Sequence, residues 1–360
     1  MPRISFFYYL LIFAPVALIV RVANADPVLV FILSALGLIP LAKLIGDATE
    51  SLAVYTGPRI GGLLNATLGN LAELIITIFA IQAGLLDLVR ASITGSIIGN
   101  LLLVLGFSIV AGGWKHGVQH FNRRAASNNA TLGVLAVVAL AIPSLFDSAL
   151  ASHPNSELLF SEGVALVLIV LYGLSILYSF RSRSDDREIN ELAKEASADE
   201  AGWPLRLTIG VLVAATIATA LVSETLVGAV EPVVKSLGLT EFFLGIIVIP
   251  IIGNIAEHVV AVQVALKNKM ELSISVSVGS SLQIALFVAP VLVFISLIFN
   301  NRLLLVFNDF ELVVLFGAAL IAALISLDGE SNWLEGAMLI AVYIIAGLAF
   351  YFLPPHVAIP

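Results

Sequence analysis

The chain has 360 residues, of which 60% are hydrophobic and 12% charged, and its mean hydropathy is +1.07. Soluble domains carry about a quarter charged residues, so this composition excludes a soluble globular protein and predicts one embedded in the lipid bilayer. There are no cysteines, so thiolate metal ligands are excluded. The net charge is −8 and the chain has no basic tract with interleaved aromatic residues, so a nucleic-acid partner is excluded.

Apolar segments long enough to cross a bilayer recur along the whole chain, since a crossing takes about 20 helical residues. Their apolar runs are continuous rather than alternating, which favours an all-α integral membrane protein with about eleven transmembrane helices over a β-barrel. We expect spans near 5–23, 27–57, 58–84, 87–112, 128–150, 156–181, 203–230, 240–267, 270–299, 308–327 and 332–353.

The first apolar segment has two interpretations. Arg3, the apolar run and Ala23-Asn24-Ala25 resemble a signal peptide with a small-residue cleavage site. Arg21, which lies between the apolar run and that site, is unfavourable for cleavage. We therefore expect residues 1–25 to form a retained N-terminal transmembrane helix.

Positive charges are divided unevenly between the two sides of the predicted bundle. If the N-terminus is cytoplasmic, thirteen of the 17 Lys and Arg residues fall in cytoplasmic segments. The other four are Arg21, Arg90, Lys235 and Arg302. Because Lys and Arg accumulate in cytoplasmic loops, the split predicts a multi-pass protein of the cell (plasma or inner) membrane with its C-terminus outside.

The two halves of the chain repeat each other at an offset of 184 residues. Gly69-Asn70-Leu71-Ala72-Glu73 aligns with Gly253-Asn254-Ile255-Ala256-Glu257, and Gly61 and Gly95-Ser96 align with Gly245 and Gly279-Ser280. Each half has five predicted spans, so the second copy must be inverted relative to the first, as in many secondary transporters. We expect a first five-helix repeat at 26–181 and a second at 203–354.

The segment 182–202 between the repeats is rich in acids. Seven acidic residues lie there: Asp185, Asp186, Glu188, Glu191, Glu195, Asp199 and Glu200. This acidic linker falls on the predicted cytoplasmic side. It is either a solvated connection between the repeats or a segment that senses or collects cations.

Glu73 and Glu257 lie about midway along their spans. A carboxylate near the bilayer centre is costly, so an intramembrane acid is a functional candidate. The inversion of the repeat lets the two motifs approach each other at the midplane from opposite directions. Asn70 and Asn254 precede the glutamates by three residues, which places each amide on the same helix face as its acid.

The neighbouring residues supply further oxygen atoms. Gly69 and Gly253 permit a helix break that would turn carbonyl groups toward the site. The next span of each repeat adds Ser96, Asn100, Ser280, Ser281 and Gln283. Carboxylate, amide and hydroxyl oxygens without sulfur are the ligands that calcium prefers. We therefore expect a metal site of Glu73, Glu257, Asn70, Asn254, Ser96, Ser280, Gln283 and Asn100, with Ca²⁺ as the transported substrate rather than a prosthetic group.

Metal and proton should compete for these oxygens. Without the metal, two close carboxylates in a low dielectric cannot both stay charged, so at least one should take up a proton. Besides Glu73 and Glu257, His258 is a candidate proton relay and Glu50 a candidate for ion entry. The alternative for His258 is that it packs between helices. The alternative for Glu50 and its neighbour Asp47 is that they lie at a solvated helix end. The small residues also fit plain helix packing, as Gly95-x-x-x-Gly99 illustrates.

The motifs resemble those of the calcium/proton antiporter branch of the calcium/cation antiporter superfamily. The resemblance is carried by Gly46-Asp47-Ala48-Thr49-Glu50, the stretch from Gly61 to Leu74, Gly95 to Leu102, Gly253 to His258 and Gly279 to Ala285. The sodium/calcium exchanger branch is similar in plan but has proline before its glutamates, where this chain has Ala72 and Ala256. The resemblance implies eleven spans and alternating access coupled to protons, with Glu73 and Glu257 as carriers. Gly99 stands where many relatives have a polar residue.

Three functions are compatible with these residues. The first is a proton-driven calcium transporter that removes calcium from the cytoplasm. The second is a sodium- or potassium-coupled exchanger of calcium. The third is an intramembrane enzyme using His258 and Glu257, but no nucleophile motif accompanies that pair, so we expect a transporter and not an enzyme. The sequence makes no prediction of oligomeric state.

Overall fold

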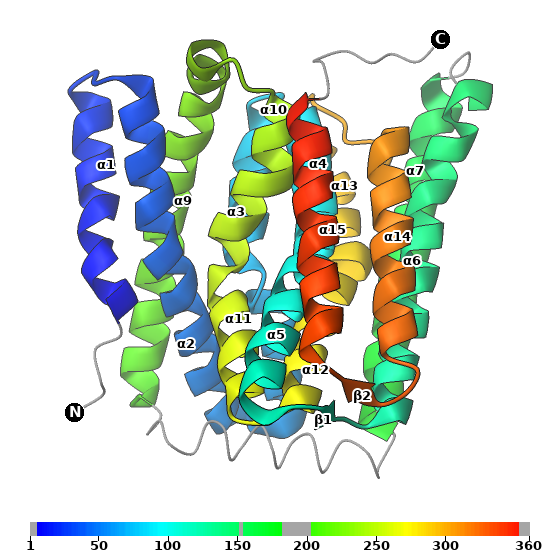
Figure 1. Cartoon of the computed structure of the whole chain (residues 1–360). Coiled ribbons are helices and arrows are strands. Elements are labelled where there is room, and N and C mark those ends of the chain that lie inside the picture. The colour runs from blue at the N-terminus through cyan, green and yellow to red at the C-terminus, as the bar shows by residue number, and fades with distance from the viewer. Residues whose placement is uncertain (1–5, 151–153, 182–202, 353–360) are drawn as a thin grey trace.

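The computed structural model describes residues 6–150, 154–181 and 203–352 as a bundle of long helices (Figure 1). The predicted acidic linker, 182–202, lies outside the described residues. The first half contains η1 (Phe6–Ile12), α1 (Phe13–Val22), α2 (Pro27–Leu68), α3 (Leu71–Gln82), α4 (Leu86–Ile98), η2 (Gly99–Val104), α5 (Leu105–His116), α6 (Arg123–Leu150) and α7 (Pro154–Arg181).

The second half follows the same plan. It contains α9 (Leu205–Leu237), α10 (Glu241–Phe243), η3 (Leu244–Val248), α11 (Ile249–Leu266), α12 (Met270–Gln283), η4 (Ile284–Val288), α13 (Ala289–Ser296), α14 (Asp309–Ile325) and α15 (Trp333–Phe352). Two short antiparallel strands, β1 (Gln119–His120) and β2 (Glu330–Ser331), join the loops before α6 and α15.

The predicted fold class is confirmed. Among the described residues, eight helices are long and apolar enough to span a bilayer. The shorter apolar helices Tyr8–Val22 and Leu71–Gln82, together with α14, bring the candidate crossings to eleven. Each of the eleven predicted spans therefore coincides with one helix or with consecutive helical segments.

Helix boundaries follow local chemistry. Asp26 caps α2 by accepting bonds from the backbone N–H groups of Val28 and Leu29, and Pro27 occupies the first helical position. Gly57, with φ of 79°, bends α2 at the boundary expected between the second and third spans. Asn308 and Glu311 form a reciprocal capping box at the start of α14.

The helices define two sides of the bundle (Figure 1). We call the side where α1, α6, α9, α12 and α15 begin the N side, and the side where α15 ends the C side. The described chain therefore begins on the N side and ends on the C side. In the view of Figure 1 the N side is at the bottom, and α3 and α11 run in opposite directions.

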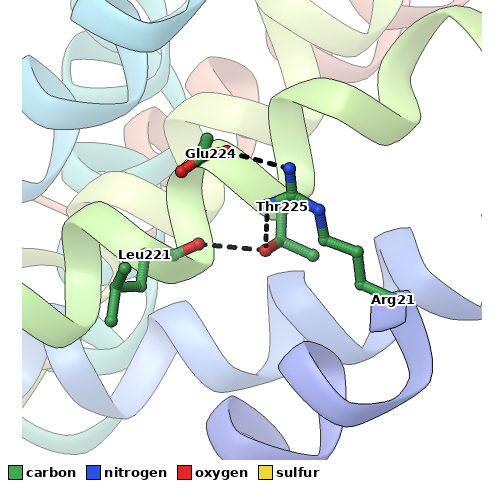
Figure 2. Close-up of polar contacts among 4 residues, drawn as sticks. All are labelled: Arg21, Leu221, Glu224 and Thr225. Carbon is green, nitrogen blue, oxygen red and sulfur yellow. Dashed lines mark hydrogen bonds and ion pairs between the residues drawn. The ribbon is translucent and has the colours of Figure 1, made fainter. Parts of the chain in front are cut away.

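The first helix packs against α2 and α9. A Cβ atom placed on Gly37 of α2 would lie 2.8 Å from the Cα atom of Ala14, so the two backbones touch. Figure 2 shows Arg21 reaching from α1 to α9, where its guanidinium donates to Glu224 (2.8 Å) and Thr225 (3.1 Å). Arg21 therefore has a structural partner within the bundle.

Asp47 has structural partners too. It accepts a hydrogen bond from Tyr8, which joins the start of the first helix to α2, and it pairs with Lys43 one turn earlier at 3.0 Å. The contact with Tyr8 ties Asp47 to the packing of η1 on α2, whereas the pair with Lys43 lies within α2.

Candidate functional site

The two glutamate motifs lie in helices of different local geometry. The chain breaks at Gly69 and Asn70, between α2 and α3, and this places Glu73 in the first turn of α3. In the second repeat, α11 continues through Gly253 and Asn254. The helix break that glycine permits therefore occurs at Gly69 but not at Gly253. In the second repeat the π-helical segment η3 instead comes directly before α11.

Each glycine of one motif lies against the glutamate of the other. A Cβ atom on Gly253 would lie 3.3 Å from the Cβ atom of Glu73. A Cβ atom on Gly69 would lie 3.4 Å from Oε1 of Glu257. The reciprocal contacts bring the two motifs together, as the inverted repeat predicted, and the missing glycine side chains allow this close approach.

Glu73 is surrounded by donors from both repeats. It is fully buried, accepts a hydrogen bond from the Ser96 hydroxyl, and accepts a second from the Asn254 amide at 3.4 Å. The same amide lies 3.1 Å from the Ser96 hydroxyl. Ser92, one turn before Ser96 on α4, also lies beside Glu73.

Glu257 belongs to a second group of polar side chains. Ser280 of α12 interacts with its carboxylate. Asn100 of η2 donates to the Ser280 hydroxyl at 3.0 Å, so the first repeat contributes to this group as well. Nearby, the Asn70 amide donates to Gln283 at 2.8 Å.

Together these residues form one site, which we call the oxygen cluster: Glu73, Glu257, Asn70, Asn254, Ser96, Ser280, Asn100 and Gln283. Glu73 and Glu257 are close enough for their charges to interact. Four buried oxygen atoms of the cluster accept no hydrogen bond from the described residues: Oδ1 of Asn70, Asn100 and Asn254, and Oε2 of Glu257. Buried acceptors without donors are costly unless a cation or water satisfies them.

The donor set suits a hard divalent cation. Among the described residues, no group of three His, Cys, Asp or Glu side chains gathers to hold a metal. The oxygen cluster instead combines two carboxylates with neutral amide and hydroxyl oxygens. Two carboxylates balance the charge of one divalent ion, and calcium accepts such mixed oxygen ligands.

Three π-helical segments interrupt the helices that carry the cluster. η2 contains Asn100, η4 begins directly after Gln283, and η3 precedes Gly253. Such segments occur frequently at functional sites because they disturb the regular pairing of backbone groups. η2 and η4 coincide under the 184-residue offset, whereas the counterpart of η3, residues 60–64, is α-helical within α2.

Glu50 and His258 do not share in the hydrogen bonds described above. Glu50 is exposed on α2. His258 follows Glu257 on α11 and is partly buried. Their proposed roles in ion entry and proton relay stay predictions.

Two buried residues were not singled out from the sequence. Ser92 could have been found from its spacing of four residues before Ser96, which places both on one face of α4. Glu311 of α14 is 2% exposed, uses one oxygen in the capping box with Asn308, and lies near Thr94 of α4. The Asn-x-x-Glu spacing was its sequence signal.

Comparison with known proteins identifies the family to which this chain belongs. The model of the family described as "Sodium/calcium exchanger protein" matches residues 27–181 and 207–352. The chain belongs to the sodium/calcium exchanger protein family. It is 46% identical over 363 residues to a protein named Ca(2+)/H(+) antiporter from Aphanothece halophytica, covering 97% of both chains.

Other relatives point to the same branch of this family. The chain is 42% identical over 340 residues to Ca(2+)/H(+) antiporter ChaA of Bacillus subtilis (strain 168), covering 94% of this chain and 96% of that one. The solved structure titled "Structure of native YfkE" superimposes with a TM-score of 0.84 at 40% identity, covering 96% of this chain and all of the other. The exchanger lies in the calcium/proton antiporter branch, as its motifs predicted.

Proposed function

We propose that this exchanger is a secondary active transporter that exchanges Ca²⁺ for H⁺ by alternating access. The observation that carries the proposal is the oxygen cluster, in which two intramembrane carboxylates lie among neutral oxygen ligands from both repeats. The names of its relatives, Ca(2+)/H(+) antiporters at 42% and 46% identity, support the same exchange.

Coupling follows from the two carboxylates. Calcium needs both Glu73 and Glu257 charged, because only two negative charges compensate a divalent ion in a low dielectric. When calcium leaves, mutual repulsion and burial favour proton uptake by the pair. Calcium and protons therefore occupy the same oxygens in turn, and the transporter changes its open side while loaded with one or the other.

The surrounding residues are proposed to hold and orient the two carriers. Asn254 and Ser96 fix Glu73 through hydrogen bonds, and the oxygen atoms without donors face a cation as ligands. Asn70, Asn100, Ser280 and Gln283 complete the set around Glu257. A route for ions past Glu50 and a proton relay through His258 are secondary elements of this proposal.

We propose further that the N side faces the cytoplasm. The thirteen-to-four division of Lys and Arg supports this orientation. Calcium bound from the cytoplasm would then leave on the C side in exchange for protons. In a cell membrane with an inward proton gradient, this direction exports calcium.

The experiment is calcium uptake into proteoliposomes with proton, sodium and potassium gradients imposed one at a time. We expect uptake to follow the proton gradient and to stop when an ionophore collapses it. A sodium- or potassium-coupled exchanger would respond to its own cation and ignore the collapsed pH gradient. Flux driven only by sodium or potassium would contradict proton coupling.

A further inference from the structure

The two halves of the bundle are packed differently at equivalent positions. On the C side, α4 crosses η3 with touching backbones. A Cβ atom on Gly95 would lie 2.7 Å from the Cα atom of Ile246, and one on Gly245 would lie 2.8 Å from the Cβ atom of Ala91. Side chains at either glycine would prevent this crossing.

The repeat places the same small residues on the N side. Under the 184-residue offset, Gly95 corresponds to Gly279, Gly245 to Gly61 and Ile246 to Gly62. Apart from the adjacent residues and backbone of their own helices, neither Gly62 nor Gly279 has a described atom within 4 Å of its Cβ position. The crossing of α4 with η3 therefore has no counterpart between α12 and the Gly62 segment of α2 in this structure.

Burial and helix geometry differ in the same way. Leu244 and Ile246 in η3 are 2% and 0% exposed, whereas Ile60, the counterpart of Leu244, is 55% exposed. The closed segment 244–248 is π-helical, and the equivalent segment 60–64 is α-helical. The structure is thus closed on the C side. Its two repeats adopt two different arrangements, and a transporter built from inverted repeats can exchange these arrangements between its repeats.

We infer that Gly62 and Gly279 form the closing contact on the N side when the transporter opens to the C side. The inference rests on the proposed alternating access and extends it to residues outside the oxygen cluster. In the opposite state α12 would cross the segment around Gly62 as α4 now crosses η3, and Gly61 would approach Leu272 and Ser275, the counterparts of Leu88 and Ala91. The two glycines leave room for backbones that approach only in that state.

A bulky residue in place of Gly62 should be tolerated in the present state and should block the state that is open to the C side. The side chain in Gly62→Leu fits the present structure, because nothing lies within 4 Å, and leucine favours helix over glycine. We expect calcium binding at equilibrium to stay within about twofold of wild type, while calcium/proton exchange falls at least tenfold. Gly210→Leu is the matched control, an exposed helical glycine of α9 with equally open space, and should exchange at wild-type rates.

Cross-linking provides the second measurement. The chain has no cysteine, so Gly62→Cys/Gly279→Cys carries one reactive pair. In the present structure the Cβ position of neither glycine is packed against the other segment, whereas a disulfide requires the two Cβ atoms to lie about 3.5–4.5 Å apart. With a mild oxidant, a disulfide should form during turnover and stop exchange until a reductant is added.

The outcomes distinguish this inference from the proposed function. Wild-type protein that does not exchange calcium for protons would contradict the proposed function itself. Wild-type exchange together with full activity of Gly62→Leu, or with no disulfide during turnover, would overturn the closing contact alone.

Discussion

Asn254 of the second repeat donates a hydrogen bond to Glu73 of the first, across 181 residues of sequence. The same amide lies 3.1 Å from the Ser96 hydroxyl, which donates to Glu73 as well. Neither repeat alone holds this carboxylate. The proposed calcium site therefore depends on the crossing of the two motifs, and separate changes on α3, α4 and α11 should all alter calcium binding at this one site.

Ser96→Ala should weaken calcium binding. The hydroxyl serves a charged carboxylate, and a hydrogen bond to a charged group contributes about 1.5–3 kcal/mol. We expect calcium affinity, measured by isothermal titration on purified protein, to fall about 10- to 100-fold. Ser108→Ala is the control, because Ser108 is fully buried on α5 and is not a member of the cluster. Equal affinities of the two variants would remove Ser96 from the site.

Calcium affinity should fall as pH falls. In the proposed mechanism calcium binds the charged carboxylates of Glu73 and Glu257, and lowering the pH adds protons to the same oxygens, so calcium and protons oppose each other by linkage. For each proton released per calcium bound, the dissociation constant should rise about tenfold per pH unit in the range where the pair titrates. A titration series over pH measures the slope. A dissociation constant that does not change with pH would separate calcium binding from protonation.

The C-terminus should lie outside the cytoplasm. This expectation comes from the division of positive charge and from the structure, in which α1 begins and α15 ends on opposite sides. A reporter that works only outside the cytoplasm should be active when fused after Pro360 and silent when fused after Lys269, in the N-side loop between α11 and α12. Activity after Lys269 and silence after Pro360 would reverse the orientation.

The acidic linker should tune transport without being required for it. Neutralising Asp185, Asp186, Glu188, Glu191 and Glu195 together leaves the oxygen cluster unchanged. We expect the calcium concentration for half-maximal flux to shift while maximal flux persists. An unchanged activation curve would make the segment a plain connection, and complete loss in a folded variant would place it in the transport pathway.

Much of the fold could be predicted because its signals are local. Continuous apolar runs predicted every span, and Gly57-Pro58 fell at the expected boundary between the second and third spans, where α2 bends. The seventh span is predicted to end at residue 230, before the end of helix α9. Pro232 lies within the helix, which runs to Leu237 and stops at the left-handed Gly238.

The site was partly predictable for a different reason. Internal repetition identified Glu73 and Glu257 as equivalent, and inversion implied that their motifs meet. The pairing of Asn254 with Glu73, and of Asn70 with Gln283, could not be predicted, because it depends on how distant helices cross. The same limit applies to Gly253, where α11 continues although glycine permits a break.

The central claim is that Glu73 and Glu257 carry calcium and protons in turn, and proton release on calcium binding tests it most directly. Purified protein in weak buffer receives calcium while a pH indicator records the protons. Glu73→Gln and Glu257→Gln keep the shape of each side chain but remove its titratable charge, so each variant should release fewer protons and its exchange should fall to background.

Glu224→Gln is the matched control, because Glu224 is the half-exposed partner of Arg21 outside the cluster, and this variant should behave as wild type. Glu50→Gln should have a smaller effect than either midplane variant. We expect proton release with wild-type protein and its reduction in both Glu73→Gln and Glu257→Gln; wild-type release and exchange in either variant would contradict the two-glutamate mechanism.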